Sequence, residues 1–383
     1  MMKTEKFIEN IKSIGIGLYA GVPDSTLKVL CDRFNKEKGI RHYTTADEGA
    51  AVALAIGQYL ASGRAGCVYM QNSGIGNIVN PITSLAHPDV YGIPMLLLIG
   101  WRGEPGKKDE PQHKFMGQIT EGLLQELEIA YSILHPQTTE EDLKSILDMA
   151  KKHMDKQKQY ALVIKKGFLE NEEQIAYENA YCMSREEAIR IILESADDES
   201  FFVSTTGKIS REAYEQSQRI YGGHERIFMT VGGMGYASMI AAGIAASAPD
   251  QRVYCLDGDG ALLMHMGNLA FLGNLALKNM VHICLNNEAH ESVGGMPTGA
   301  GSLSYERLAL DAGYSYTSRV DSAEGLKQEL RNIAEKQGNV FLEVQVAISS
   351  RDDLGRPKET PKENKEQFME TIRNSPAVIR RAL

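Results

Sequence analysis

Residues 253–260 read VYCLDGDG, and residues 281–287 read VHICLNN. Each stretch begins with an apolar run, which predicts a buried strand of a parallel sheet. The first ends in Gly258-Asp259-Gly260 and the second in Asn286-Asn287. Because parallel strands end at the same edge of a sheet, we expect a carboxylate and a carboxamide to face one crevice. The two stretches therefore predict an α/β fold and the position of its site.

The polar groups at this edge suit a metal bound to a diphosphate. Asp259 and Asn287 offer two hard oxygen atoms, and Mg2+ prefers oxygen ligands completed by water and phosphate. Gly258 and Gly260 lack a Cβ, so the backbone can approach a diphosphate closely. An Asp-Gly or an Asn-Asn pair alone usually marks a turn. Together, at consecutive strand ends, they predict a Mg2+-diphosphate site.

Strand-like and helix-like segments alternate on both sides of a polar segment, residues 171–182. This rhythm predicts two parallel sheets with right-handed crossovers. We expect a first domain at 1–170, a linker at 171–182 and a second domain at 183–383. The polar stretch 101–118 contains Gly and Pro and predicts a long loop. The expected strands are 17–20, 41–45, 65–72, 95–100 and 162–166, then 201–204, 227–230, 252–256 and 281–285.

The composition of the chain limits the classes of protein and partner that it allows. The 383 residues suffice for two domains, and the net charge of −9 argues against a nucleic-acid partner. The apolar runs are too short to span a membrane, and the charged first ten residues lack a signal-peptide core, which predicts a cytoplasmic protein. Cys67, Cys255 and Cys284 lie in strand-like runs, which is typical of reduced, buried thiols.

The Gly258–Asn287 pattern resembles the thiamine-diphosphate-binding motif of the pyruvate-decarboxylase-like enzymes, as does Gly232-Gly233-Met234-Gly235. The resemblance implies an α/β fold of two doubly wound, parallel-sheet domains, one binding the pyrimidine and one the diphosphate of thiamine diphosphate. It also implies that Mg2+ is held by the side chains of Asp259 and Asn287 and the main-chain carbonyl of Ala289. Met234 would support the bent cofactor, and the Gly232 carbonyl would accept a hydrogen bond from its 4′-amino group.

The first half has a matching pattern. Residues 44–51, TTADEGAA, resemble the family segment that carries a catalytic glutamate, and Glu48 matches its position. That glutamate contacts N1′ of the aminopyrimidine, and packing beside small residues would raise its pKa by desolvation. Residues 71–77, QNSGIGN, stand where the family has a Gly-rich turn. Gln71 and Asn72 are therefore expected at the cofactor.

Residues 21–25, 71–77, 112–114, 206–212 and 287–290 together resemble the family branch that decarboxylates phosphonopyruvate, and this resemblance covers nearly the whole chain. Sulfopyruvate or another short 2-keto acid stays open as the substrate, although the sulfopyruvate enzymes commonly divide the two halves between subunits. An anionic substrate needs cations or helix N-termini against the general negative charge. His290, three residues after Asn287, is a candidate for proton transfer. The candidate substrate residues are Asp24, Ser25, His113, Lys114, Lys208 and Arg211.

The short interval between the halves implies that the middle domain of larger family members is absent. In the family, the cofactor lies between domains of different chains, so we expect a homo-oligomer, at least a dimer. Carboligation is a weaker alternative, because that class normally carries the middle domain. A non-catalytic metabolite-binding α/β protein is an alternative of another class. A dinucleotide-binding dehydrogenase is disfavoured, because residues 232–237 lack G-x-G-x-x-G spacing.

Overall fold

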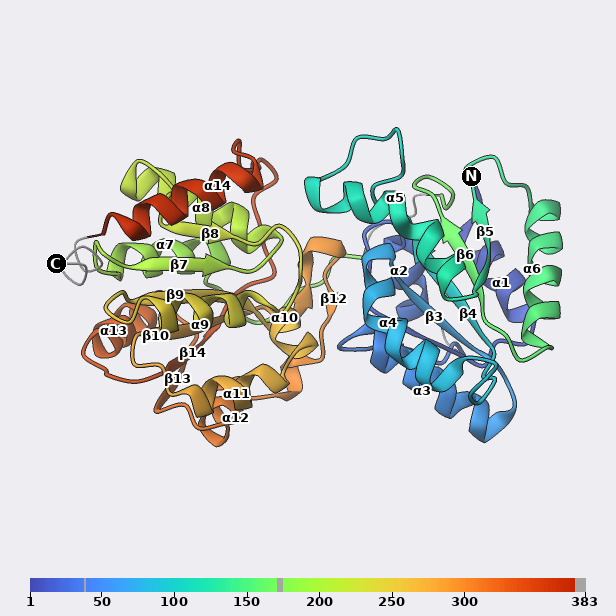
Figure 1. The fold of residues 1–383 in the computed structure, drawn as a ribbon, viewed down its shortest axis with the longest axis horizontal. Helices are drawn as coiled ribbons and strands as arrows, with labels where there is room; N and C mark the ends of the chain where they lie inside the picture. The colour runs from blue at the N-terminus through green and yellow to red at the C-terminus, as the bar shows by residue number, and fades with distance from the viewer. Residues whose placement is uncertain (38, 171–174, 376–383) are drawn as a thin grey trace. The chain divides into compact units, whose positions relative to one another are not determined.

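The structure, a computed structural model, describes residues 1–37, 39–170 and 175–375. The chain divides into two compact units (Figure 1). The first unit is residues 1–176 with 293–296, and the second is residues 177–292 with those from 297 onward. No helix in the described part is long and apolar enough to cross a membrane.

Each unit is built on a six-stranded parallel sheet. The first sheet has the order β2-β1-β3-β4-β6-β5, and the second, read from its other edge, β8-β7-β9-β10-β14-β13. Numbered within its own sheet, each order is 2-1-3-4-6-5, so the two sheets share one topology. The strands are β1 (Leu18–Gly21), β2 (His42–Thr44), β3 (Gly66–Gln71), β4 (Met95–Gly100), β5 (Ala130–Leu134), β6 (Tyr160–Ile164), β7 (Phe201–Ser204), β8 (Ile227–Met229), β9 (Val253–Gly258), β10 (Met280–Asn286), β13 (Tyr316–Val320) and β14 (Val340–Gln345).

Helices cover both faces of each sheet (Figure 1). In the second unit, α7, α8 and α13 share one apolar core with the sheet, while α9, α11 and α12 share the other. The helices are α1 (Thr4–Ser13), α2 (Lys28–Lys36), α3 (Glu48–Ser62), α4 (Ile75–Pro81), α5 (Pro111–Glu126), α6 (Glu140–Met154), α7 (Arg185–Ser195), α8 (Lys208–Tyr221), α9 (Ala237–Ser247), α10 (Asp259–Met264), α11 (Gly267–Leu275), α12 (Tyr305–Asp311), α13 (Ala323–Ala334) and α14 (Pro361–Arg373). Short elements complete the chain: η1 (Asn72–Gly74), η2 (Ile82–Ala86), β11 (Ala289–His290), η3 (Glu291–Val293), β12 (Met296–Pro297) and η4 (Ala300–Ser302).

The central strands explain why the sequence reveals this fold. Every residue of β4, β9, β10 and β14 is buried, because helices lie on both faces. Strand β4 is an uninterrupted apolar run, and β9 and β10 are mainly apolar up to their polar ends, whereas β14 contains Glu343 and was not among the expected strands. The predicted parallel α/β sheets are confirmed. All five cysteines are free, and Cys67, Cys255 and Cys284 are buried as expected.

The predicted loop at 101–118 is wrong in its second half. Helix α5 begins at Pro111, so His113 and Lys114 lie in its first turn. Proline is favoured at that position because its missing N–H has no partner in the first turn of a helix. Asp109 holds the shorter loop by accepting from the Gly103 backbone N–H at 2.8 Å. The polar composition of residues 111–118 concealed a surface helix.

The sequence pattern also fails to predict β5 and α6. Strand β5 is an edge strand whose first four residues are half-buried, so it lacks the apolar run of a central strand. Of the expected linker, residues 171–174 lie outside the described residues, and 175–182 form neither helix nor strand.

Candidate functional site

In each unit, the strand order reverses next to the first strand, between β1 and β3 and between β7 and β9. Ligands of open parallel sheets bind in the crevice outside the carboxyl ends of the strands at this reversal. Asp24 and Ser25 follow β1, and Gln71 ends β3. Lys208 begins α8, four residues after β7, and Asp259 follows β9 directly. Each unit thus carries predicted residues at its reversal.

Asp259 is a buried carboxylate at the start of α10. Its Oδ2 accepts from Thr298 Oγ1 at 2.5 Å, and backbone N–H groups of Gly260 and Asn287 also donate to it. Burial raises the pKa of Asp259 to about 7, against the opposing effect of these donors. Within the described residues, Asp259 forms no ion pair, so its negative charge has dipoles around it but no cation.

Asn287 lies beside Asp259 because β9 and β10 pair in parallel, with Gly258 opposite Leu285. Its Nδ2 donates to Glu291 Oε2 at 2.9 Å, and its Oδ1 accepts from the Ala289 backbone N–H at 3.1 Å. The side chain of the preceding Asn286 is hydrogen-bonded within the sheet, because its Nδ2 donates to the buried Glu343 of β14. Of the two asparagines, Asn287 therefore has its carboxamide at the end of the sheet.

The turn after Asn287 is conformationally unusual. Glu288 has a φ of 61°, in the left-handed region that few non-glycine residues adopt. Its carboxylate accepts from Tyr181 Oη at 2.7 Å, while Asn179 Nδ2 donates to the Asn287 carbonyl at 3.0 Å. Part of the expected linker thus packs on this turn, which leads directly into the buried Ala289.

Met234 and His290 meet over Gly260. A Cβ added to Gly260 would lie 3.2 Å from both the Met234 methyl group and the His290 ring, so a larger residue would force these side chains to shift. Gly232 precedes them on a turn in which Gly233 and Gly235 have positive φ. Burial lowers the pKa of His290 to about 4, so the ring is neutral at pH 7.

Lys208 is engaged by a second cluster at the same edge. Its Nζ donates to Glu291 Oε1 at 3.0 Å and to Ser350 Oγ at 2.6 Å. The amine that was expected to meet a substrate anion is therefore ion-paired within the unit. Arg211 lies one turn later on α8 and is half-buried.

In the first unit, Glu48 is buried at the start of α3, 5 % exposed. Its Oε2 accepts from Asn77 Nδ2 at 2.7 Å, and its Oε1 would lie 2.4 Å from a Cβ on Gly74. Only glycine leaves room for the carboxylate there. Burial raises the pKa of Glu48, against the hydrogen bond from Asn77. Burial therefore desolvates Glu48 as expected, and its contacts come from Gly74 and Asn77, which follow β3.

Gln71 and Asn72 have separate local roles. Asn72 is fully buried, donates from Nδ2 to the Arg102 carbonyl and to Thr120 Oγ1, and accepts from the Arg102 N–H. Its amide groups are thus bonded inside the unit, where they fasten the loop after β4. Gln71 Nε2 donates to Ser73 Oγ at 2.6 Å.

Asp24, Ser25 and His113 gather around Arg102. The Asp24 side chain is buried, its Oδ1 has no hydrogen-bond partner, and burial raises its pKa against the positive charge of Arg102. Arg102 donates to Ser25 Oγ at 2.9 Å and pairs with Asp109. Burial and then the Arg102 charge lower the pKa of His113. Lys114, by contrast, is exposed.

The core of the second unit holds a further cluster of potential metal ligands. Cys255, Asp257 and His282 bring three potential metal ligands together, but His282 already contacts Asp257 Oδ2 and Tyr314 Oη, and all three are buried. These contacts satisfy His282 within the core.

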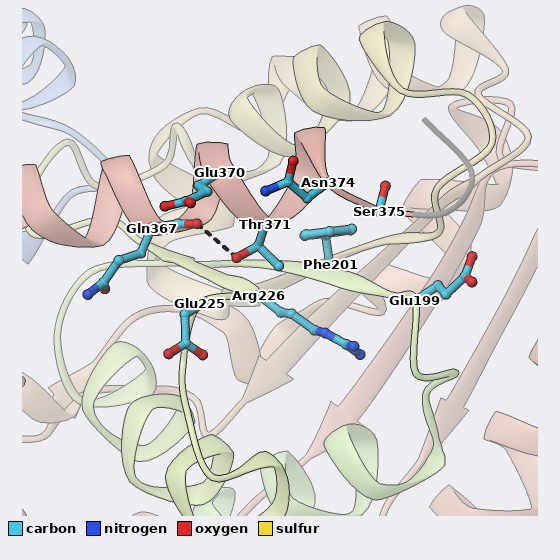
Figure 2. A pocket seen from close by; sticks show the side chains of 9 residues that line it. All are labelled: Glu199, Phe201, Glu225, Arg226, Gln367, Glu370, Thr371, Asn374 and Ser375. Atoms are coloured by element: carbon cyan, nitrogen blue, oxygen red, sulfur yellow. Dashed lines mark hydrogen bonds between the residues drawn. The ribbon is translucent and has the colours of Figure 1, made fainter. Parts of the chain in front are cut away.

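Figure 2 shows a hollow of about 480 Å3 between α14 and the starts of β7 and β8, lined by Phe201, Arg226 and Thr371 among others. It lies at the amino edge of the sheet, away from every predicted residue. We therefore place the functional site at the carboxyl edge, where ligands of such sheets bind.

Sequence reasoning missed several residues that organise these sites. Arg102 follows the end of β4 and could have been found by the same strand-end rule that singled out Asp259. Asn77 lay inside a motif already noted. Thr298 and Arg185 are far from their partners along the chain, so no local spacing signals them. The missed residues are Asn77, Arg102, Asp109, Arg185, Glu291 and Thr298.

Known families match both units. Residues 1–125 match "Thiamine pyrophosphate enzyme, N-terminal TPP binding domain", and residues 212–344 match the corresponding C-terminal TPP binding domain. The fold and the matched domains define a thiamine-pyrophosphate enzyme.

Full-length relatives narrow the class. The chain is 33% identical to phosphonopyruvate decarboxylase of Streptomyces viridochromogenes, over 98% of this chain and 96% of the relative. It is 32% identical to the enzyme of the same name from Streptomyces hygroscopicus, over 97% and 94%. Sulfopyruvate decarboxylase of Methanosarcina acetivorans is 26% identical, over 96% and 97%. The chain belongs to the thiamine-pyrophosphate-dependent decarboxylase family that includes phosphonopyruvate decarboxylase, and it is a carboxy-lyase.

Proposed function

We propose that this chain converts phosphonopyruvate to phosphonoacetaldehyde and CO2, using thiamine diphosphate anchored through Mg2+. The observation that carries the proposal is the buried Asp259 carboxylate beside Asn287 at the carboxyl ends of neighbouring strands. The higher identity to phosphonopyruvate decarboxylases than to the sulfopyruvate enzyme favours the phosphonate substrate. A sulfopyruvate relative also spans both halves, so the fusion of the halves does not itself separate the two substrates.

The donor atoms fit the proposed cofactor. Asp259, Asn287 and the carbonyl of Ala289 would hold Mg2+ through oxygen atoms, and a divalent cation would offset the uncompensated charge of Asp259. Met234, Gly232 and Gly260 would line the cofactor, and Gly258 would let the diphosphate approach the backbone. We propose residues 1–170 as the pyrimidine-binding domain and 183–383 as the diphosphate-binding domain.

Bound thiamine diphosphate supplies the nucleophilic carbon and the electron sink for loss of CO2. Glu48 would hold a proton on its carboxyl, because burial favours the neutral form, and share it with N1′ of the aminopyrimidine. His290, neutral at pH 7, would offer a ring N–H to the reacting groups without introducing a charge. The burial of Glu48 would keep water from competing for its proton.

Substrate recognition would fall to polar groups at the strand ends. Asp24, Ser25 and His113 share their surroundings with Arg102, whose positive charge suits an anionic acid. Lys208 and Arg211 lie at the start of α8, where a helix N-terminus also favours anions. Lys114 is a weaker candidate for the substrate, because its side chain is exposed. Gln71 and Asn72, expected at the cofactor, are weaker candidates for that role, because both already have hydrogen-bond partners.

We further propose a homo-oligomer, at least a dimer, with active sites shared between subunits, as the family resemblance implies. A cytoplasmic location stays a prediction from the sequence. The alternative of a non-catalytic metabolite-binding protein conflicts with the family membership and with a buried acid in each unit.

The test is direct turnover. Purified protein with thiamine diphosphate and Mg2+ would be given phosphonopyruvate, sulfopyruvate or pyruvate, and CO2 release would be followed. We expect the highest kcat/KM for phosphonopyruvate and a loss of about 10²- to 10⁴-fold in kcat for Glu48→Gln.

The matched control is Asp47→Asn, which alters the acid next in sequence. Asp47 caps α3 by accepting from the Ala50 N–H, and an asparagine oxygen can accept there equally well, so this change should cost less than about 0.5 kcal/mol of stability and leave kcat within about threefold. A preference for sulfopyruvate would contradict phosphonopyruvate as the substrate. The absence of any decarboxylation would contradict the proposed function.

A further inference from the structure

Glu291 lies at the junction between Asn287 and a buried ionic cluster. It follows Asn287 by four residues, in the turn after β11, and its side chain is 8 % exposed. Its Oε2 accepts from Asn287 Nδ2 at 2.9 Å and from Arg185 Nη1 at 2.5 Å. Its Oε1 accepts from Lys208 Nζ at 3.0 Å.

The rest of the cluster fixes Glu291 in place. Arg185 is 4 % exposed and also donates from Nε and Nη2 to the two carboxylate oxygens of Glu212, each at 2.7 Å. Two cationic side chains, Arg185 and Lys208, thus donate to Glu291, which is held in place as their common acceptor.

An ionised carboxylate can only accept hydrogen bonds. The carboxamide group facing it must be the NH2 group, so the orientation of Asn287 is dictated by chemistry and not by a choice between two similar atoms. With Nδ2 held on Glu291, Oδ1 is directed to the other side, where it now accepts from the Ala289 N–H.

We infer that Glu291 is a positioning residue that holds the Asn287 carboxamide with its oxygen available to a divalent cation, and that Arg185 and Lys208 fix the Glu291 carboxylate in place for this. The inference rests on the proposed function of Asn287 as a Mg2+ ligand. It also gives Lys208 a role through Glu291, in addition to its place at the start of α8. Mutation of a group that orients a metal ligand typically lowers metal affinity by about 10- to 100-fold.

The test compares Mg2+ dependence in two variants that weaken the same arginine cluster. Glu291→Gln can accept from or donate to Asn287, so it permits both carboxamide orientations. Glu212→Gln removes the negative charge of one of the two carboxylates that pair with Arg185. The hydrogen bond of Asn287 goes to Glu291 and not to Glu212. For each protein, thiamine diphosphate binding to the full-length protein would be measured by isothermal titration calorimetry across a series of Mg2+ concentrations, beside thermal melting without Mg2+.

We expect Glu291→Gln to raise the half-saturating Mg2+ concentration by roughly tenfold or more. Glu212→Gln should shift it by less than about threefold, while it lowers the melting temperature at least as much as Glu291→Gln. At saturating Mg2+, kcat of Glu291→Gln should return to within about threefold of wild type, because the ligand is misoriented and not lost.

Glu291→Asp serves if Glu291→Gln does not fold. It keeps the charge beside Arg185 and Lys208 but withdraws the carboxylate from Asn287 by one methylene, so weaker Mg2+ binding with unchanged melting is expected. Equal Mg2+ shifts in Glu291→Gln and Glu212→Gln, or no shift in any Glu291 variant, would overturn the inference and leave the proposed function intact. Wild-type binding of thiamine diphosphate that is independent of Mg2+ would overturn both.

Discussion

At the scale of single residues, the candidate site is defined by buried acids whose charge is incompletely compensated. Glu48, Asp259 and Asp24 all have pKa values raised by burial. Such acids oppose folding when they are ionised, so their retention points to ligands that use them. Each acid is held by neighbours that adjust its protonation, and these neighbours allow specific tests.

Asn77→Ala removes the donor that favours ionised Glu48. The pKa of Glu48 should rise further. Because the protonated carboxyl is the proposed working form, the alkaline limb of the kcat/KM profile should move to higher pH. The folded-state pKa is raised, so the variant should lose stability relative to wild type as pH rises from the folded-state pKa of Glu48 in wild type to the higher one in the variant. Asn80→Ala changes another exposed asparagine of α4 and should leave the profile unmoved. Identical profiles for wild type and Asn77→Ala would refute this role.

Asp259 should make Mg2+ binding depend on pH. Its pKa of about 7 means that the carboxyl must lose a proton to bind a cation below pH 7. The half-saturating Mg2+ concentration should fall about tenfold per pH unit up to pH 7 and then level. Titrations from pH 5.5 to 8.5 with saturating thiamine diphosphate would measure this. Thr298→Val removes a donor to Asp259 and should move the levelling point to higher pH, whereas a flat wild-type curve would contradict the assignment.

At the scale of elements, Asn72 connects three parts of the first unit. It sits in η1 and bonds to both backbone groups of Arg102 in the loop after β4 and to Thr120 in α5. These bonds place Arg102 beside Ser25. The geometry around Arg102 therefore depends on an asparagine whose own amide is fully used inside the protein.

Asn72→Ala should destabilise the first unit by about 1–3 kcal/mol, because it leaves buried backbone groups without partners. Trp101 is the single tryptophan of the chain and donates from its indole N–H to the Gly117 carbonyl, so its fluorescence reports on this region during urea unfolding. Gln71→Ala, with its exposed hydrogen bond, should cost less than about 0.5 kcal/mol. If both variants unfolded at the same urea concentration, the role given to Asn72 would be wrong.

At the scale of the whole molecule, two units of one topology each carry half of the proposed chemistry. Glu48 belongs to the first unit and Asp259 to the second. If active sites are shared between subunits, two inactive variants should complement each other. A heterodimer of Glu48→Gln and Asp259→Asn chains would contain one intact site and one doubly altered site.

Such heterodimers, purified through a different tag on each chain, should show about half of wild-type activity. Each homodimer should be inactive. Sites formed within one chain would give an inactive heterodimer, because every chain carries a defect. Light scattering after size-exclusion chromatography would establish the number of subunits in the same preparations.

The sequence alone determined the features that depend on local order along the chain. Central parallel strands must be apolar on both faces, so β4, β9 and β10 were visible as runs, and polar residues at their ends marked the crevice. Asp259, Asn287 and Glu48 could be predicted as site residues because each belongs to a short motif of consecutive residues. The edge strand β5 and the surface helix α5 were not, because half-buried elements carry mixed composition.

Only the tertiary structure decided which partners the polar side chains find. Thr298 lies far from Asp259 along the chain, and Arg185 lies far from Glu291, yet each pair forms a hydrogen bond. Lys208 was predicted at the right edge of the sheet but is bound by Glu291. The backbone topology determines where each strand ends, and the sequence indicates it through the apolar runs of the buried strands. The pairing of charges depends on close contacts between segments that no spacing in the sequence encodes.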